Sequence, residues 1–227
     1  MELYDFNMDL MPSNGLLVVD TSGITPVKIE KSLVGSLIYK SQIGVEAERM
    51  IYNKLRNRGR VLTTKGCLEE IDNSIISLRR MIKSTKRDRG NYCYKRGKKI
   101  HNSITEHKSI EVRNTMGEII RIQERFYGLL REGMEEYKDF PIQVNPDETL
   151  QFAKRDSRLS ECNSGLVSRA LCLGSWNGIL SSDLALINNY KEGVKRFGLV
   201  NCFAYNGVTG KVERVSSSER SISQPIK

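Results

Sequence analysis

The sequence has no long apolar runs and no closely paired cysteines. Its apolar runs extend over only a few residues and its first lysine is Lys28, so we expect a cytoplasmic protein with neither a transmembrane helix nor a signal peptide, and with no membrane partner. The five cysteines are scattered and none forms a C-x-x-C pair, which argues against a disulfide framework or a zinc ribbon. We expect most of them to be small core residues. Cys93, His101 and His107 are too few and too loosely spaced to favour a metal site.

Acidic residues are nearly missing from residues 79–99, where Asp88 is the single acid. Ten lysines and arginines stand against it, so this basic segment carries the whole net charge of +9 and the rest of the chain sums to zero. Tyr92 and Tyr94 within it can stack on bases, and we therefore expect contact with nucleic acid. The alternative is a solvated basic loop without a partner. The ten cations are Arg79, Arg80, Lys83, Lys86, Arg87, Arg89, Lys95, Arg96, Lys98 and Lys99.

Length and composition indicate a folded chain. The 227 residues are 39% hydrophobic and 28% charged, which is ordinary for a globular protein and argues against wholesale disorder. This length fits one large domain, or one domain of ordinary size that carries an insertion.

Short apolar strands alternate with helical patterns along the chain. We expect strands at 16–19, 60–64, 178–180 and 199–205, helices at 29–40, 44–57, 159–174 and 184–198, and a final hairpin over 207–214. This βαβ rhythm predicts an α/β fold with a mainly parallel sheet and helices on both faces.

Two long apolar stripes interrupt this rhythm. The first, on a helix that begins near Lys65, joins Leu68 to Ile82 at helical spacing, and the second joins Met116 to Leu130. Because the basic segment lies between them, the pattern predicts an antiparallel helical hairpin over about 73–140 with a basic tip at 79–99.

Three acids follow apolar strands at positions where side chains of a parallel sheet converge. Asp20 ends the run "GLLVVD", Glu70 lies in the helix after "VLTT", and Asp183 follows "GILSS". Singly, Asp183 can cap a helix, Glu70 can be a surface acid and Asp20 can form an Asx turn. Together they repel one another unless they share a cation, and an oxygen-rich cluster suits Mg²⁺ or Mn²⁺.

Four segments resemble the successive motifs of PIN-domain ribonucleases: "LLVVDTSG", "VLTTKGCLEEI", "LSECNSGLVSRALCLG" and "GILSSDLAL". The resemblance covers about 15–78 and 155–205. It implies a PIN-like three-layer sandwich over 15–215 with a mainly parallel central sheet, interrupted by the hairpin as an insertion. Residues 1–14 would be an N-terminal extension and 216–227, which are Ser-rich and polar, a loose tail.

The resemblance also implies a set of site residues. Asp20, Glu70 and Asp183 would be the catalytic and metal-binding acids, with Thr21 and Ser181 as supporting hydroxyls. Where the third motif should place an acid, the chain has Asn163, which offers an oxygen to a metal but no charge. Glu161 is the nearest acid, and it lies about 200° around a helix from Asn163.

The implied activity is metal-dependent hydrolysis of phosphodiester bonds in single-stranded RNA, in RNA processing, with Mg²⁺ or Mn²⁺ as cofactor. The resemblance is also compatible with a homodimer. The main alternative is a PIN-like domain weakened at Asn163 that serves as an RNA-binding or ribonucleoprotein scaffold. A structure-specific DNA nuclease of related fold would normally need more acids.

Two other enzyme classes lack their motifs. "GVTGK" at 207–211 does not have the glycine spacing of a P-loop, and Asp20 is not followed by the second Asp of aspartyl-phosphate phosphatases.

Overall fold

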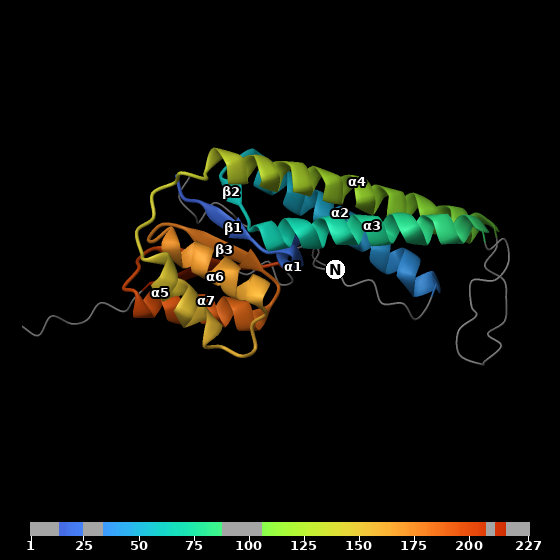
Figure 1. The fold of residues 1–227 in the computed structure, drawn as a ribbon. Coiled ribbons are helices and arrows are strands. Elements are labelled where there is room, and N and C mark those ends of the chain that lie inside the picture. Colours follow the sequence, from blue (N-terminus) through green and yellow to red (C-terminus); the bar gives the residue numbers. More distant parts are fainter. Residues whose placement is uncertain (1–13, 25–33, 88–105, 208–211, 217–227) are drawn as a thin grey trace, which may run out of the picture.

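A five-stranded, mostly parallel sheet lies between two layers of helices (Figure 1). The computed structural model describes residues 14–24, 34–87, 106–207 and 212–216. The strand order is β2-β1-β3-β4-β5, and only β5 runs antiparallel to its neighbour. This is the predicted α/β class with a mainly parallel sheet. The strands are β1 (Leu17–Val19), β2 (Val61–Leu62), β3 (Gly178–Ser181), β4 (Cys202–Asn206) and β5 (Val212–Val215).

Seven helices are found within the described residues, and they cover both faces of the sheet. Helices α2 (Val34–Arg58), α3 (Lys65–Arg87) and α4 (Glu106–Glu136) cover one face. Helices α5 (Pro146–Lys154), α6 (Glu161–Cys172) and α7 (Leu184–Arg196) cover the other, and the short α1 (Thr21–Ile24) follows β1.

The first strand is buried on both sides because it is near the centre of this sandwich. Leu17 and Val19 belong to the core beneath α2, α3 and α4, whereas Leu16 and Val18 belong to the core beneath α6 and α7. Successive side chains of a strand point to opposite faces, so a strand with helices on both sides needs an uninterrupted apolar run. This explains the apolar run "LLVV".

Helices α3 and α4 lie side by side and antiparallel, as the two stripes predict (Figure 1). Arg79 of α3 pairs with Glu124 of α4, and Gly133 near the end of α4 lies against Val61, close to where α3 begins. Their apolar stripes share one core with α2 and β1, so the base of the hairpin helps to cover the sheet. The expected insertion boundary at residue 73 falls inside the continuous helix α3.

Two helical details differ from the sequence-based expectation. The predicted helices at 29–40 and 44–57 are wrong as two elements, because α2 is continuous over Val34–Arg58. A helix-interior glycine such as Gly44 costs only about 1 kcal/mol, which the packing of Ile51 and Leu55 into the core offsets. Residues 25–33 lie outside the described part of the chain.

Helix α5 was not predicted, although its sequence carries a start signal. Asn145 caps it by accepting a hydrogen bond from the backbone N–H of Asp147 at 2.9 Å, and Pro146 occupies its first turn. Asn-Pro followed by two acids is typical of a helix N-terminus.

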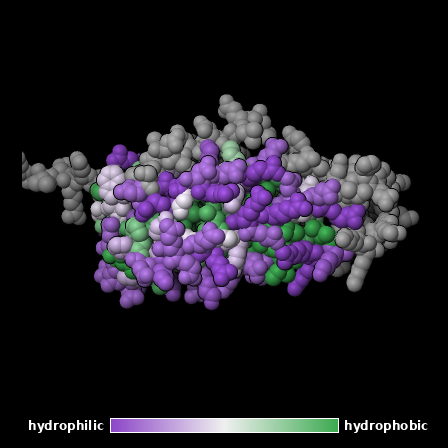
Figure 2. Space-filling model, turned by 90° about the horizontal axis from the view of Figure 1, so that it is seen from above, coloured by the Kyte–Doolittle hydropathy of each residue, from purple (hydrophilic) through white to green (hydrophobic). Residues whose placement is uncertain are grey.

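An antiparallel hairpin joins β4 to β5, so its first strand precedes the expected range of 207–214, of which residues 208–211 are not described. The predicted N-terminal extension and tail lie almost wholly outside the described residues. Polar side chains dominate the described surface in Figure 2. Across the described ranges, no helix combines the length and apolar character needed to cross a bilayer.

Candidate metal centre

The carboxyl ends of β1 and β3 meet where the strand order changes direction. The chain passes from β1 to β2 on one side of β1, and β3 later joins its other side. In open parallel sheets, ligands bind at such a switch point, outside the carboxyl ends of the strands. Asp20 directly follows β1, and Ser181 ends β3.

Asp20 has a buried carboxylate, and hydroxyl groups around it compensate for its loss of contact with water. Its side chain is only 4% exposed. Ser181 Oγ donates to its Oδ2 at 2.6 Å, Ser22 Oγ donates to the same oxygen, and Thr21 Oγ1 lies 3.3 Å from Oδ1. Hydrogen bonds of this kind offset the cost of burying a charge.

Thr21 connects Asp20 to Glu70. Its Oγ1 lies 2.5 Å from Oε2 of Glu70, which is exposed in the second turn of α3. The neighbouring Glu69 instead pairs with Lys65 along the helix, at 3.7 Å. Glu70, and not Glu69, therefore belongs to the group around Asp20.

Asp183 joins this group through Ser181 and Asn163. Its backbone N–H donates to Ser181 Oγ at 3.0 Å, and Asn163 Nδ2 donates to its Oδ2 at 3.0 Å. Its other oxygen, Oδ1, caps α7 by accepting from the backbone N–H of Ala185 at 2.8 Å. Asp183 is therefore both a helix cap and a member of the cluster.

We call Asp20, Glu70, Asn163 and Asp183 the acidic network. The Thr21 hydroxyl lies between Asp20 and Glu70, the Ser181 hydroxyl links Asp20 to Asp183, and Asn163 donates to Asp183. Carboxylate oxygens are the ligands that Mg²⁺ and Mn²⁺ prefer, and Mg²⁺ usually keeps several waters. The hydroxyl groups stand between the acids, and the three carboxylates do not all approach within 4.8 Å of one another. The donor set fits a hydrated divalent cation better than a fully dehydrated one.

Two nearby acids lie outside the hydrogen bonds of the acidic network. Glu161 is exposed at the first position of α6, and Ser160, not an acid, caps this helix by accepting from the N–H of Asn163. Asp156 accepts two hydrogen bonds from the Arg158 guanidinium, which lower the pKa of that carboxyl to about 2.

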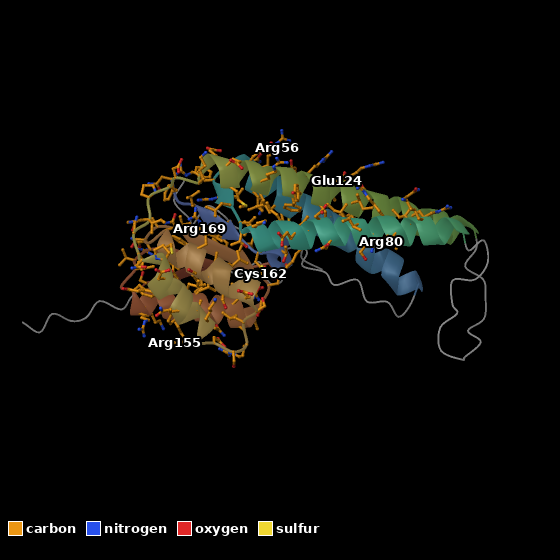
Figure 3. All side chains as sticks on the ribbon, in the orientation of Figure 1. Arg56, Arg80, Glu124, Arg155, Cys162 and Arg169 are labelled. Atoms are coloured by element: carbon orange, nitrogen blue, oxygen red, sulfur yellow. The ribbon has the colours of Figure 1, made fainter. Side chains whose placement is uncertain are left out.

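Sequence reasoning missed a pair of cysteines beside the network. Cys67 Sγ and Cys162 Sγ lie 3.8 Å apart, and Figure 3 shows Cys162 where α6 faces the start of α3. Burial, followed by the nearby Cys67 and Glu70, raises the pKa of the Cys162 thiol to about 12. Residues 95 positions apart leave no local signal for such a pair. Two other cysteines, Cys172 and Cys202, are buried as expected.

Only three of the ten predicted nucleic-acid contacts have described side chains. Arg79 is paired with Glu124 at 2.5 Å. Arg80 and Lys83 are exposed on α3, and Figure 3 shows the position of Arg80. Lys86 and Arg87 belong to the last turn of α3, but their side chains lie outside the described residues, as do Arg89, Lys95, Arg96, Lys98 and Lys99.

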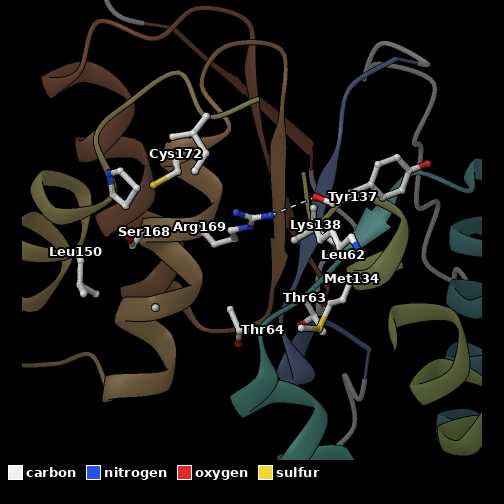
Figure 4. Close-up of a pocket in the computed structure, with 13 residues that line it drawn as sticks. Leu62, Thr63, Thr64, Met134, Tyr137, Lys138, Leu150, Ser168, Arg169 and Cys172 are labelled. Carbon is white, nitrogen blue, oxygen red and sulfur yellow. Dashed lines mark hydrogen bonds between the residues drawn. The ribbon is translucent and has the colours of Figure 1, made fainter. Parts of the chain in front are cut away.

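A pocket of about 480 Å³ opens between α6, the end of β2 and the segment after α4. Its lining includes Lys138, Thr64 and Arg169, and Arg169 points across it to the backbone carbonyl of Tyr137 (Figure 4). None of the four residues of the acidic network lines this pocket, so it does not define the candidate metal centre.

Comparisons with protein-family models, with curated proteins and with solved structures found no match for this chain. Its function therefore has to be inferred from the geometry of the site itself.

Proposed function

We propose that the chain is a metal-dependent endoribonuclease that hydrolyses phosphodiester bonds in single-stranded RNA, on a PIN-like α/β domain. The observation that carries this proposal is the acidic network at the switch point of the sheet. Asp20, Glu70 and Asp183 come from three separate segments and share one hydrogen-bonded cluster. Three acids gathered in this way repel one another, and a shared divalent cation would remove that repulsion.

In the proposed reaction, the three carboxylates would hold Mg²⁺ or Mn²⁺. A bound divalent ion lowers the pKa of an attacking water and stabilises negative charge on the departing oxygen. Thr21 donates to one oxygen of Glu70, and Ser181 donates to one oxygen of Asp20. Each hydroxyl fixes the orientation of its carboxylate and leaves the second carboxylate oxygen available to the cation. Asn163 would have to turn its amide oxygen toward the cation.

The basic segment supports RNA as the substrate. It carries all of the net positive charge of the chain, and it begins at Arg79 in the second half of α3. Cations that contact phosphates position a nucleic acid without reading its sequence, which suits a separate catalytic centre.

One observation favours the second candidate function, an RNA-binding or ribonucleoprotein scaffold. Both oxygens of Asp183 accept hydrogen bonds from the protein, one of them from the amide that stands in place of an acid. Because both of its oxygens already accept hydrogen bonds, Asp183 does not need a cation to compensate its charge. The two candidates share RNA binding and differ in cleavage.

The test is cleavage of a labelled single-stranded RNA with Mn²⁺, with Mg²⁺ and with a chelator, for the wild type and Glu70→Gln. We expect cleavage that needs a metal and that Glu70→Gln abolishes. The matched control is Glu69→Gln, which removes the neighbouring exposed carboxylate and should cut at the wild-type rate. RNA that the wild type binds but does not cut under any condition would favour the scaffold.

A further inference from the structure

Two cysteines share one acid with the acidic network. The ligand atoms of Cys67, Glu70 and Cys162 all lie within 4.8 Å of one another, and no other group of three His, Cys, Asp or Glu side chains does so among the residues whose side chains are described. We infer that Cys67, Cys162 and Glu70 form a Zn²⁺ site, with water as the fourth ligand. This sulfur site differs from the oxygen site proposed for Mg²⁺ or Mn²⁺, with which it shares Glu70.

The separation of the two sulfur atoms fits tetrahedral zinc. A zinc–sulfur bond is about 2.3 Å long, so two thiolates on one tetrahedral ion lie roughly 3.8 Å apart. The distance between Cys67 Sγ and Cys162 Sγ is 3.8 Å. The pair therefore needs little rearrangement to hold such an ion.

The fold brings the two thiols together at the starts of two helices. Cys67 is in the first turn of α3 and Cys162 in the first turn of α6. Gly66 allows this approach, because a Cβ atom at that position would lie 2.8 Å from Cys162 Sγ. Helices from opposite layers of the sandwich thus meet at the cysteine pair.

The chemistry and exposure of the donors favour zinc over harder ions. Thiolates prefer soft or borderline ions, and Mg²⁺ and Ca²⁺ prefer oxygen. Cys67 is buried, Cys162 is half-buried and Glu70 is exposed, so the site has a closed side and a side open to solvent. Three protein ligands with an open position are typical of zinc sites that keep a water.

Sharing Glu70 would couple this site to the proposed nuclease, and this part of the inference rests on the proposed function. The hydroxyl of Thr21 holds one oxygen of Glu70 beside Asp20. Zinc on the cysteine pair would draw that carboxylate toward the sulfur atoms and away from Mg²⁺ or Mn²⁺. Zinc would then inhibit cleavage through Cys67 and Cys162.

The binding test uses Co²⁺ as a spectroscopic substitute for Zn²⁺ on the full, reduced chain. We expect one equivalent of Co²⁺ to produce a thiolate-to-cobalt charge-transfer band that Zn²⁺ abolishes. Cys67→Ala and Cys162→Ala should each remove the band, and Glu70→Gln should weaken Co²⁺ affinity by about tenfold or more. Cys162 is half-buried, so its variant remains informative if Cys67→Ala does not fold.

The controls are Cys172→Ala, which removes another thiol of α6, and Cys93→Ser, which removes the thiol of the basic segment. Both should keep the band. No band in the wild type, or a band that survives Cys162→Ala, would overturn the zinc site. These spectra do not depend on RNA cleavage, so their outcome is distinct from that of the proposed function. If the chain cuts RNA, Zn²⁺ should inhibit the wild type but not Cys162→Ala.

Discussion

Asn163 donates a hydrogen bond from its Nδ2 to Oδ2 of Asp183 at 3.0 Å, in the position where the resemblance to PIN-domain ribonucleases implies an acid. The amide removes one negative charge from the network and occupies an oxygen that a cation would use. Metal affinity should therefore be limited at this contact.

Asn163→Asp should restore that negative charge and make the thermal stability of the protein depend on bound metal. Two carboxylates at this separation repel each other, so we expect the melting temperature to fall by a few degrees without metal and to recover with Mn²⁺. RNA cleavage with Mn²⁺ should increase if the domain is a weakened nuclease. A variant that neither loses stability nor responds to Mn²⁺ would contradict the placement of Asn163 beside the cation.

The basic segment should supply the salt dependence of RNA binding. Changing Lys95, Arg96, Lys98 and Lys99 to Gln should weaken binding and reduce the slope of log K against log salt by roughly 0.7 for each lost phosphate contact on single-stranded RNA. Binding measured at several salt concentrations checks this.

The matched control neutralises four exposed cations on other parts of the chain, and it should leave the slope nearly unchanged. An equal loss of slope in the two variants would contradict the prediction, because positive charge elsewhere on the chain would then contribute to RNA binding as much as the basic segment does. These control positions are Arg131, Lys154, Arg155 and Lys195.

Glu48 should make stability depend on pH. This α2 residue is 5% exposed, its Oε2 finds no hydrogen-bond partner within the described chain, and burial raises the pKa of its carboxyl to about 8. Between about pH 4.5, the pKa in the unfolded state, and pH 8, Glu48 is therefore protonated in the folded state and ionised in the unfolded state. Wild-type stability should fall as pH rises through that window and level off above it.

Glu48→Gln should remove this pH dependence. At about pH 9 the variant should exceed the wild type by on the order of 5 kcal/mol in the free energy of unfolding, and at about pH 4 the two should nearly agree. Urea unfolding at both pH values measures the difference. Glu46→Gln, at an exposed position on the same helix, is the control and should follow the wild type.

Gly133 should be essential for the packing of α4 against the sheet. A Cβ at this position would lie 1.9 Å from the backbone oxygen of Val61, so Gly133→Ala must displace the helix or the strand. We expect a loss of about 1–3 kcal/mol. Gly128→Ala, on the same helix with open space around it, should instead stabilise by about 0.5–1 kcal/mol. Thermal unfolding of both variants tests the contrast, and equal effects would contradict this contact.

Local signals explain why the strands and the acids could be predicted from the sequence. An apolar run that ends in a carboxylate places Asp20 at the end of a central strand, and the order of the strands then brings Asp183 beside it. Helix α5 could also have been predicted from Asn145 and Pro146, which mark its start. The cysteine pair could not, because only the approach of the first turns of α3 and α6 joins Cys67 and Cys162.

The most direct measurement is cleavage of a labelled single-stranded RNA by the wild type and by Asp20→Asn, with Mn²⁺, with Mg²⁺ and with chelator. A carboxylate that holds a catalytic ion contributes several kcal/mol, so the variant should lose roughly 100-fold or more in rate while its circular dichroism and melting remain close to wild type. Cleavage that needs both the metal and Asp20 is the predicted result. A folded Asp20→Asn that cuts at the wild-type rate would contradict the proposal.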